Sequence, residues 1–349
     1  MKKYALTTLS LVLCFFILTS FETMTTKGKP KKQKSGVTLT NLDRTVLPNV
    51  DFYQFACGGW MKLNPLGAEY ARYGNFDQLG ENNQKQLQDL VTKLAAQKNA
   101  PGTVEQKLGD LYNIGMNTEQ LERQGNQPIQ AELQKIARLQ RNQLSTQLAE
   151  MLLEGHSCFF GIYGSSDPDD SRMTIAHFWQ SGLGMGDRDY YLDAGQQKIR
   201  DEYRKLMAKM FSISGYSKLA GFEKQEKEMA QRVLDLECCM AEAFIDKVVL
   251  RDPYQTIHKC TVNDLQKTIP AVNLNEYLKV LNLKLDTLNV GMPTYFSALN
   301  RLLSISDWEE MKAYMAWQVI NGAASYLSDE LVNARFDFYG KTLSGQQEN

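Results

Sequence analysis

The strongest constraint on how this chain folds is the spacing of its apolar residues, which recur every three or four positions along most of the sequence. Side chains at this spacing share one face of an α-helix, so each stripe predicts an amphipathic helix whose apolar face points into a core. The stripes fall within residues 87–95, 104–112, 129–139, 144–152 and 199–211, with a long helix from about Gly221 to Asp246 and a last block from Ser306 through Leu331. The sequence therefore predicts a mainly α fold.

Two of these helices are predicted to begin with a capping box. Thr103 precedes Gln106 by three residues, and Ser306 stands in the same relation to Glu309. In this motif the hydroxyl accepts a hydrogen bond from the third helical residue, whose side chain returns one to the backbone of the cap. Gly155 is expected to end the helix over 144–152, because glycine readily adopts the left-handed conformation found there.

One segment interrupts the helices. Residues 158–163 and 173–179 are rich in aromatic and β-branched side chains, and the acidic loop Ser165–Asp170 separates them. This pattern predicts a β-hairpin or two neighbouring strands. The expected fold class is therefore a multi-helix unit with a small β-hairpin insert.

The first 21 residues have the features of an export signal. Lys2 and Lys3 precede a mostly apolar run from Ala5 to Phe21, which is slightly shorter than the roughly 20 residues that a membrane span needs. Residues 1–21 are therefore either a removed signal peptide or a retained anchor or lipid-attachment segment, and residues 22–40 are a Lys-rich linker. Both alternatives predict an exported protein, periplasmic or extracellular.

The charge balance and the cysteine spacing exclude further classes of function. The 39 Lys and Arg residues nearly balance 40 Asp and Glu, so the chain has no overall field that would attract nucleic acid as a partner. Five cysteines remain after the signal, at spacings unlike those of a metal ribbon and with their disulfide state left open: Cys57, Cys158, Cys238, Cys239 and Cys260. The adjacent pair lies in a helical pattern and is expected to be buried.

The chain has only three histidines, His156, His177 and His258. None begins an H-E-x-x-H pair, in which two imidazoles on one helical face hold zinc beside a basic glutamate. The sequence also lacks a G-x-S-x-G turn, a phosphate-binding loop and a C-x-x-C pair. We therefore expect no metal site and no catalytic residue in this chain, and His177, in an apolar strand pattern, is expected to be structural.

Three segments are too particular to be ordinary helical sequence: Asp51–Trp60 (DFYQFACGGW), Arg72–Asp77 (RYGNFD) and Ser181–Tyr191 (SGLGMGDRDYY). Together they resemble the N-terminal region of the neprilysin and endothelin-converting enzyme family of zinc metalloendopeptidases. The sequences RDPY at 251–254 and AWQV at 316–319 follow in a compatible order. The resemblance covers nearly all of the chain from Asn41 to Gly345.

This resemblance implies one part of a two-lobed fold built around a central cavity. In such enzymes the C-terminal half carries the zinc site, and the mainly helical N-terminal half limits access to small peptides. The chain resembles that gating half alone, with residues 41–345 as the N-terminal peptidase domain and 346–349 as a truncated end. Zinc and the catalytic half that binds it are then expected outside this chain, which would be inactive by itself.

The resemblance also implies substrate-binding residues. In relatives the arginine matched by Arg72 reaches into the cleft and holds substrate on the leaving-group side, and positions matched by Phe76 and Asp77 line the same region. A guanidinium suits this role because its planar fork binds a carboxylate or carbonyl at two points. The alternative is that Arg72 pairs with Glu69 or Asp77 and only orders the loop. Some relatives have a second basic residue where this chain has Gly80, which implies weaker recognition here.

Two further positions follow from the same resemblance. The cysteine matched by Cys57 pairs with one in the catalytic half of disulfide-rich relatives; the alternative is a small buried residue beside Gly58. Asp187, Arg188 and Asp189 are expected to form a structural ion-pair loop.

The expected function is therefore to admit and orient peptides in an exported zinc metalloendopeptidase whose catalytic half is the partner. The rival hypothesis is an exported helical binding module that captures carbohydrate or peptide without catalysis. A third hypothesis is a poorly folded remnant that aggregates through uncovered apolar surface.

Overall fold

The computed structural model describes residues 36 and 38–347, so the predicted export signal and most of the Lys-rich linker lie outside the described residues. The chain divides into two compact units, one up to Leu66 and one from Gly67 onward. Among the described residues, no helix combines the length and the apolar character needed to cross a membrane.

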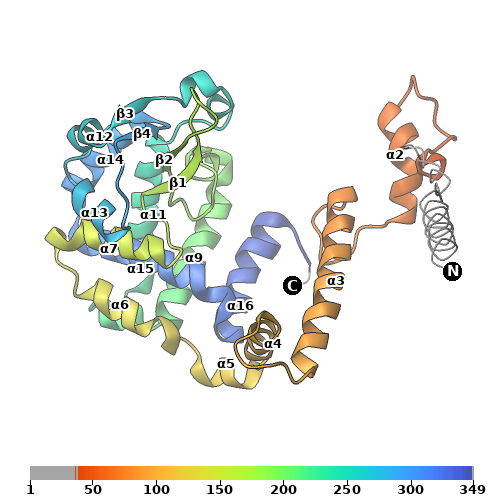
Figure 1. Ribbon diagram of the computed structural model, residues 1–349, viewed down its shortest axis with the longest axis horizontal. Coiled ribbons are helices and arrows are strands. Elements are labelled where there is room, and N and C mark those ends of the chain that lie inside the picture. Colours follow the sequence, from red (N-terminus) through yellow and green to blue (C-terminus); the bar gives the residue numbers. More distant parts are fainter. Residues whose placement is uncertain (1–35, 37, 348–349) are drawn as a thin grey trace, which may run out of the picture. The chain divides into compact units, whose positions relative to one another are not determined.

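The first unit contains the short 3-10 helix η1 (Leu39–Asn41) and helix α2 (Phe52–Leu63) (Figure 1). The Asp51 carboxylate caps α2 by accepting a hydrogen bond from the Gln54 N–H at 2.9 Å. The first motif segment therefore forms a capped helix.

Asp43 joins α2 to the segment before it. Its side chain is 5% exposed and accepts a hydrogen bond from the Lys62 ammonium at 2.8 Å. This bond, joined by those from Thr45 and Gln54, holds the pKa of Asp43 well below its usual range. A side chain at Gly58 would collide with that of Asp43, which explains the need for glycine here.

The second unit is mainly helical and carries one four-stranded sheet, as the sequence predicts except for the number of strands. Its α-helices are α3 (Asn75–Ala96), α4 (Val104–Gly115), α5 (Thr118–Gln124), α6 (Gln130–Ala137), α7 (Leu144–Leu153), α8 (Asp189–Leu192), α9 (Gln197–Ile213), α10 (Tyr216–Leu219), α11 (Glu226–Ala243), α12 (Val262–Thr268), α13 (Leu274–Val280), α14 (Pro293–Ile305), α15 (Trp308–Ala323) and α16 (Asp329–Phe336). Shorter turns of helix are η2 (Gln127–Ile129), η3 (Arg141–Gln143), η4 (Ala194–Gln196), η5 (Val249–Arg251), η6 (Pro253–Gln255), η7 (Ala324–Tyr326) and the π-helical η8 (Asp337–Ser344).

The sheet has the strand order β1-β2-β4-β3, with strands β1 (Phe160–Ser166), β2 (Thr174–Gln180), β3 (Lys259–Thr261) and β4 (Thr287–Val290). The antiparallel pair β1–β2 confirms the predicted hairpin, although Ser165 and Ser166 belong to β1, so the acidic loop starts only at Asp167. Strand β4 runs parallel to β2 and antiparallel to β3. Strands β3 and β4 are not predicted from the sequence, because segments of three or four residues carry too little alternation of apolar and polar side chains.

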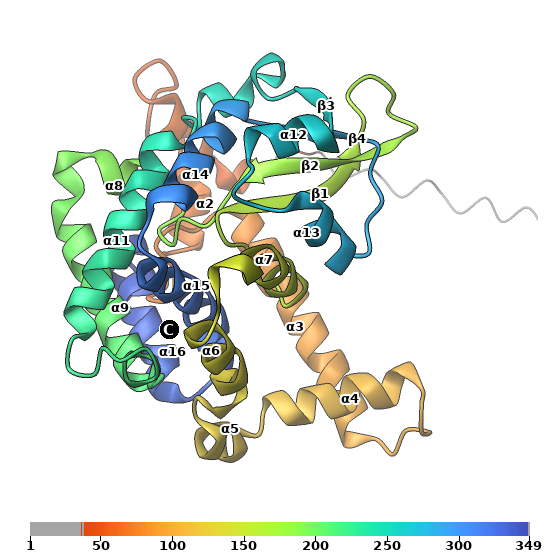
Figure 2. The ribbon, with the colours of Figure 1, turned by 90° about the vertical axis from the view of Figure 1, so that its left-hand side faces the viewer.

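Helix α15 lies at the centre of the core, with α9 and α11 beside it (Figure 2). Nine of its 16 residues are buried, and a helix covered on several sides needs apolar side chains around most of its circumference. Trp317 is fully buried, and its indole N–H donates to the Tyr203 hydroxyl of α9 at 2.7 Å. The indole is therefore both packed and hydrogen-bonded.

Several predicted helix ends differ from the structure. Helix α15 is capped by Asp307, whose carboxylate accepts from the N–H groups of Glu309 and Glu310, so the capping box predicted at Ser306 is wrong. A carboxylate one residue closer to the helix takes that role. The long helix predicted from Gly221 to Asp246 is only α11, and the last helical block is broken between α15 and α16.

Two predicted ends are confirmed. Thr103 caps α4 by accepting from the Gln106 N–H at 3.3 Å, although the Gln106 side chain accepts from Gly102 rather than from Thr103. Helix α7 ends before Gly155, which has φ +89°.

The apolar stripes have two outcomes. Those of α6 and α7 are buried as predicted, with Leu133 and Ile136 fully covered. In α3, by contrast, none of the residues is buried, and Leu87 and Leu90 are 51% and 49% exposed. In α4, Val104 and Leu111 are exposed as well. The prediction that the stripes of α3 and α4 point into a core is therefore wrong for the described chain.

Candidate functional site

The predicted substrate-binding residues lie at the start of α3. Gly74 is the N-cap, and the Asp77 carboxylate in the first turn accepts a hydrogen bond from the Gly74 N–H at 2.8 Å. The negative charge also complements the positive end of the helix dipole. Asp77 therefore has a structural task that fixes where the helix begins.

Arg72 is exposed just before this helix. Within residues 38–347 its guanidinium has no ion pair or hydrogen bond, so the expected alternative of local pairing with Glu69 or Asp77 is not observed. Phe76 is 89% exposed. Arg72 and Phe76 thus present a cation and an aromatic ring with no local structural task.

The loop that carries Arg72 is held on one side by aromatic residues. The Tyr73 hydroxyl donates to Glu81 Oε2 at 2.7 Å, and this hydrogen bond raises the pKa of Tyr73 to about 12. The Tyr70 ring packs edge-on against Tyr73 with 5.0 Å between centroids. These contacts anchor the loop to the second turn of α3.

The last described residues hold the loop on its other side. The Gln347 N–H donates to the Ala68 carbonyl at 3.0 Å, and the Gln346 side chain donates to the Glu69 carbonyl at 2.8 Å. Residues nearly 280 positions apart in sequence therefore meet next to Arg72.

Helices α3 and α4 form a hairpin that we call the α3–α4 hairpin. Gly109 of α4 allows close approach to the backbone at Leu94, and the Thr92 hydroxyl donates to that of Tyr112 at 3.3 Å. Nine large apolar side chains of this hairpin and its ends are exposed, which we call the exposed hairpin residues: Phe76, Leu79, Leu87, Leu90, Val104, Leu108, Leu111, Ile114 and Met116. Exposure of many large apolar side chains on two adjacent helices is typical of surfaces that contact another protein segment.

The third motif segment, Ser181–Tyr191, folds over a buried carboxyl group on α11. Glu237 is fully buried and accepts hydrogen bonds from the hydroxyls of Tyr191 at 2.8 Å and Tyr203 at 3.2 Å. The Gly184 N–H also points at it, at 3.4 Å. Burial raises the pKa of Glu237 to about 8, so the group is mostly protonated at neutral pH.

The ion-pair loop predicted in this segment is confirmed. Lys247 contacts Asp187 and Asp189, each at 2.7 Å, and the Arg188 guanidinium donates to the Phe244 carbonyl at 2.7 Å. These charges tie the segment to the chain that follows α11, which is a structural role.

Two of the three histidines meet around Asn289 of β4. The Asn289 amide lies 3.1 Å from His177 Nδ1, and its Oδ1 accepts from the His258 backbone N–H at 2.6 Å. His177 is buried within the sheet, as its apolar strand pattern predicts, whereas the role of Asn289 carries no signal in the sequence. In the part of the chain that the structure describes, no three His, Cys, Asp or Glu side chains gather as a metal site would require.

The five described cysteines are all free thiols. Cys239 is exposed on the outer side of α11 and Cys238 is half-buried, so the prediction that this pair is buried is wrong for Cys239. Cys57 is half-buried, and its pairing with a cysteine of another half stays a prediction.

Relatives are found along most of the chain. A sequence model of the N-terminal region of peptidase family M13 matches residues 48–349. Endothelin-converting enzyme 1 of Bos taurus is 28% identical over 310 residues, covering 85% of this chain and 40% of the relative. Membrane metallo-endopeptidase-like 1 of Homo sapiens is 26% identical over 335 residues, covering 88% of this chain and 42% of the relative.

Among solved structures, the zinc metalloprotease Zmp1 of Mycobacterium tuberculosis in complex with an inhibitor is similar at a TM-score of 0.83 and 29% identity. The match covers 90% of this chain and 48% of that one. The chain therefore spans less than half the length of these relatives.

Proposed function

This chain belongs to peptidase family M13, and we propose that it is the substrate-access and substrate-orienting portion of an exported zinc metalloendopeptidase that acts on peptides. A catalytic half supplied by another segment or chain completes the enzyme. By itself this chain cuts nothing.

The observation that carries the proposal is the exposed, unpaired Arg72 on an anchored loop. Because the Tyr73–Glu81 hydrogen bond and the Asp77 cap fix the loop, little freedom is lost when a ligand binds. The guanidinium offers two parallel donors to a peptide carboxylate or carbonyl. Arg72 therefore orients substrate, with Phe76 as an apolar contact.

Zinc belongs to the catalytic half in this proposal, because the described residues offer no set of ligands that fits it. When bound there, zinc supplies an activated water for attack on the peptide bond. Our chain contributes no step of that attack. It holds the peptide and narrows access to the cleft.

The exposed hairpin residues support the presence of a partner. Burial of a single large apolar side chain contributes roughly 1.5–3 kcal/mol, so covering nine of them would favour association strongly. The hydrogen bonds from Gln346 to Glu69 and from Gln347 to Ala68 bring the last described residues close to the loop that carries Arg72. We propose that the catalytic half covers the α3–α4 hairpin, and that Cys57 pairs with one of its cysteines.

Export is part of the proposal and rests on the sequence of residues 1–21, with the basic start and apolar run described above. All five cysteines of the described chain are free thiols, so Cys57 is available for the proposed disulfide with a cysteine of the catalytic half. Localisation of the full chain with and without residues 1–21 tests this directly; cytoplasmic retention of both would contradict export.

A peptidase assay tests whether cleavage requires the catalytic half in addition to this chain. The purified chain, incubated with zinc and a set of short peptides, is expected to show no cleavage above background. Joined as one polypeptide to the catalytic half of Zmp1, it is expected to cut, and a chelator should abolish the activity. Chelator-sensitive cleavage by the chain alone would refute the proposal.

Arg72 is tested in the joined enzyme. Arg72→Ala is expected to raise KM for short peptides about tenfold or more, since a charge-assisted hydrogen bond contributes roughly 1.5–3 kcal/mol. Arg72→Lys should restore part of the loss. Arg301→Ala removes another exposed arginine that has no partner among the described residues, and it should leave KM unchanged. Equal losses in both alanine variants would remove Arg72 from the substrate site.

A further inference from the structure

A groove beside α9 is lined mainly by positively charged side chains. It lies between α9 and the first turn of α11, with a cavity volume of about 630 Å³. Its charged residues are Arg204, Lys205, Lys209 and Lys227, with Glu226 as the single carboxylate. We call it the α9 groove.

Two of these cations are already engaged. Lys205 pairs with Glu202 at 2.7 Å. The Arg204 guanidinium donates to Gln231 Oε1 at 2.7 Å and pairs with Asp201 at 3.4 Å. These interactions leave donors of both cations unused, because an ammonium has three N–H groups and a guanidinium five.

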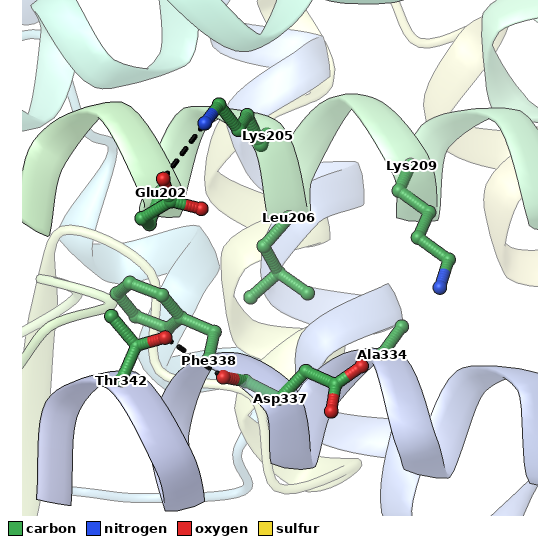
Figure 3. Close-up of a pocket in the computed structure, with 8 residues that line it drawn as sticks. All are labelled: Glu202, Lys205, Leu206, Lys209, Ala334, Asp337, Phe338 and Thr342. Carbon is green, nitrogen blue, oxygen red and sulfur yellow. Dashed lines mark hydrogen bonds and ion pairs between the residues drawn. The ribbon is translucent and has the colours of Figure 1, made fainter. Parts of the chain in front are cut away.

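The other two cations have no carboxylate of their own. Lys209 and Lys227 are exposed and form no ion pair with any residue that the structure describes. Figure 3 shows the neighbouring pocket between α9 and η8, which Lys205 and Lys209 also line. There the Lys209 amino group extends from α9 toward Ala334 without an interaction, whereas Lys205 bends toward Glu202. The groove therefore has unneutralised positive charge.

Glu226 does not supply the missing countercharge. Its carboxylate accepts from the Ser217 hydroxyl at 2.9 Å and from the Lys224 N–H at 3.2 Å, so it is directed toward its own turn. Among the residues that the structure describes, no ion pair joins it to Lys209 or Lys227.

The spacing of the cations indicates the shape of the ligand. Lys205 and Lys209 are one helical turn apart, a rise of about 6 Å along the axis of α9. Alternate residues of an extended peptide are separated by about 6.6 Å and point to the same side. A peptide with acidic residues at alternate positions therefore matches the lysines, whereas a single small anion would contact only one of them closely.

We propose that the α9 groove binds a carboxylate-rich stretch of peptide, as a contact separate from the Arg72 segment. The inference rests on the proposed function in one respect, since peptide is the substrate class of that function. The groove then selects substrates that carry an acidic segment away from the bond to be cut.

Direct binding to the full chain tests the proposal without any catalytic half. The probe is a fluorescein-labelled hexapeptide, Glu-Gly-Glu-Gly-Glu-Gly, compared with its Gln counterpart by fluorescence polarisation. The Glu peptide is expected to bind about tenfold more tightly at about 50 mM salt and to lose most of that preference at about 300 mM, where exposed charges are screened. Equal binding of the two peptides would overturn the proposal.

Matched variants locate the site. Lys209→Ala/Lys227→Ala is expected to weaken binding of the Glu peptide about fivefold. Lys279→Ala/Lys284→Ala removes the same charge from two exposed lysines of another groove and should change binding less than twofold. Similar losses in the two double variants would mean nonspecific attraction and would overturn the assignment.

Two further readouts complete the test. Circular dichroism and thermal melting of both variants should match those of the parent, so that a loss of binding is not a loss of fold. Inorganic tripolyphosphate that displaces the probe better than the unlabelled Glu peptide would identify a general anion site and overturn the peptide assignment. Failure at this groove leaves the Arg72 test untouched, because the two measurements share no residue.

Discussion

The α3–α4 hairpin and the α9–α11 pair have similar apolar spacing and opposite surroundings. In α9, Tyr203 and Met210 are fully buried against α11 and α15. In α3, Leu87 and Leu90 remain about half exposed. Apolar periodicity therefore indicates that a segment can form an amphipathic helix. It does not indicate which other element covers the apolar face of that helix.

Truncation of the central core residue should have the largest effect. Trp317→Ala removes a fully buried indole and its hydrogen bond to Tyr203, which is expected to lower the free energy of unfolding by about 4 kcal/mol. Leu111→Ala in the exposed hairpin should lower it by less than about 1 kcal/mol. Urea titration measures both, and equal losses would break the distinction between the two regions.

The buried carboxyl group of the core predicts a pH dependence. Because the pKa of Glu237 is raised from 4.5 to about 8 on folding, the folded state binds more protons than the unfolded state between these values. The part of the free energy of unfolding that comes from the neutral carboxyl group is therefore fully present below pH 4.5. It is lost as pH rises toward 8, and at roughly 1.4 kcal/mol per pKa unit the loss amounts to several kcal/mol.

Glu237→Gln keeps the shape of the group and cannot ionise. Melting curves of the two proteins should lie close together at pH 5, and the Gln variant should be clearly more stable at pH 8.5. Parallel pH profiles for the two proteins would show that Glu237 is not the titrating group.

Substitutions on the exposed face of the α3–α4 hairpin are expected to have a smaller effect on the free energy of unfolding. Leu87→Gln/Leu90→Gln is expected to change the free energy of unfolding by no more than about 0.5 kcal/mol, since neither side chain is buried. The same change should reduce self-association of the isolated chain, measured by analytical ultracentrifugation. The exposed residues Val248 and Ile305 give a matched control as Val248→Gln/Ile305→Gln. A similar reduction by the control would mean that the hairpin has no special part in association.

Much of the architecture is predictable from local patterns. The stripes of α6 and α7 and the β1–β2 hairpin follow from residues close in sequence. The ion pairs of Asp187 and Asp189 do not, because their partner Lys247 lies 58 to 60 residues later in the chain. Strand β4 is different, since it pairs in parallel with a strand more than 100 residues earlier, and no local signal marks such a partner.

The candidate site likewise has features that are predictable from local sequence and features that are not. The motif around Arg72 is recognisable as a sequence, and its position at the start of a capped helix follows from Asp77. The lack of any local partner for Arg72 depends on where Glu69 and Asp77 point, which only the three-dimensional structure shows. The buried Glu237 has no sequence signal either, because an acidic residue in a helix is usually exposed.

Hydrogen exchange of the α3–α4 amides tests the central claim most directly, because it compares the hairpin with α15 in the same molecule. In the chain alone, amides of α3 and α4 should exchange much faster than those of α15. Joined to a family catalytic half, the hairpin should gain strong protection while α15 changes little. Full protection of the hairpin in the chain alone, or none after joining, would contradict the view that this surface is covered by the catalytic half.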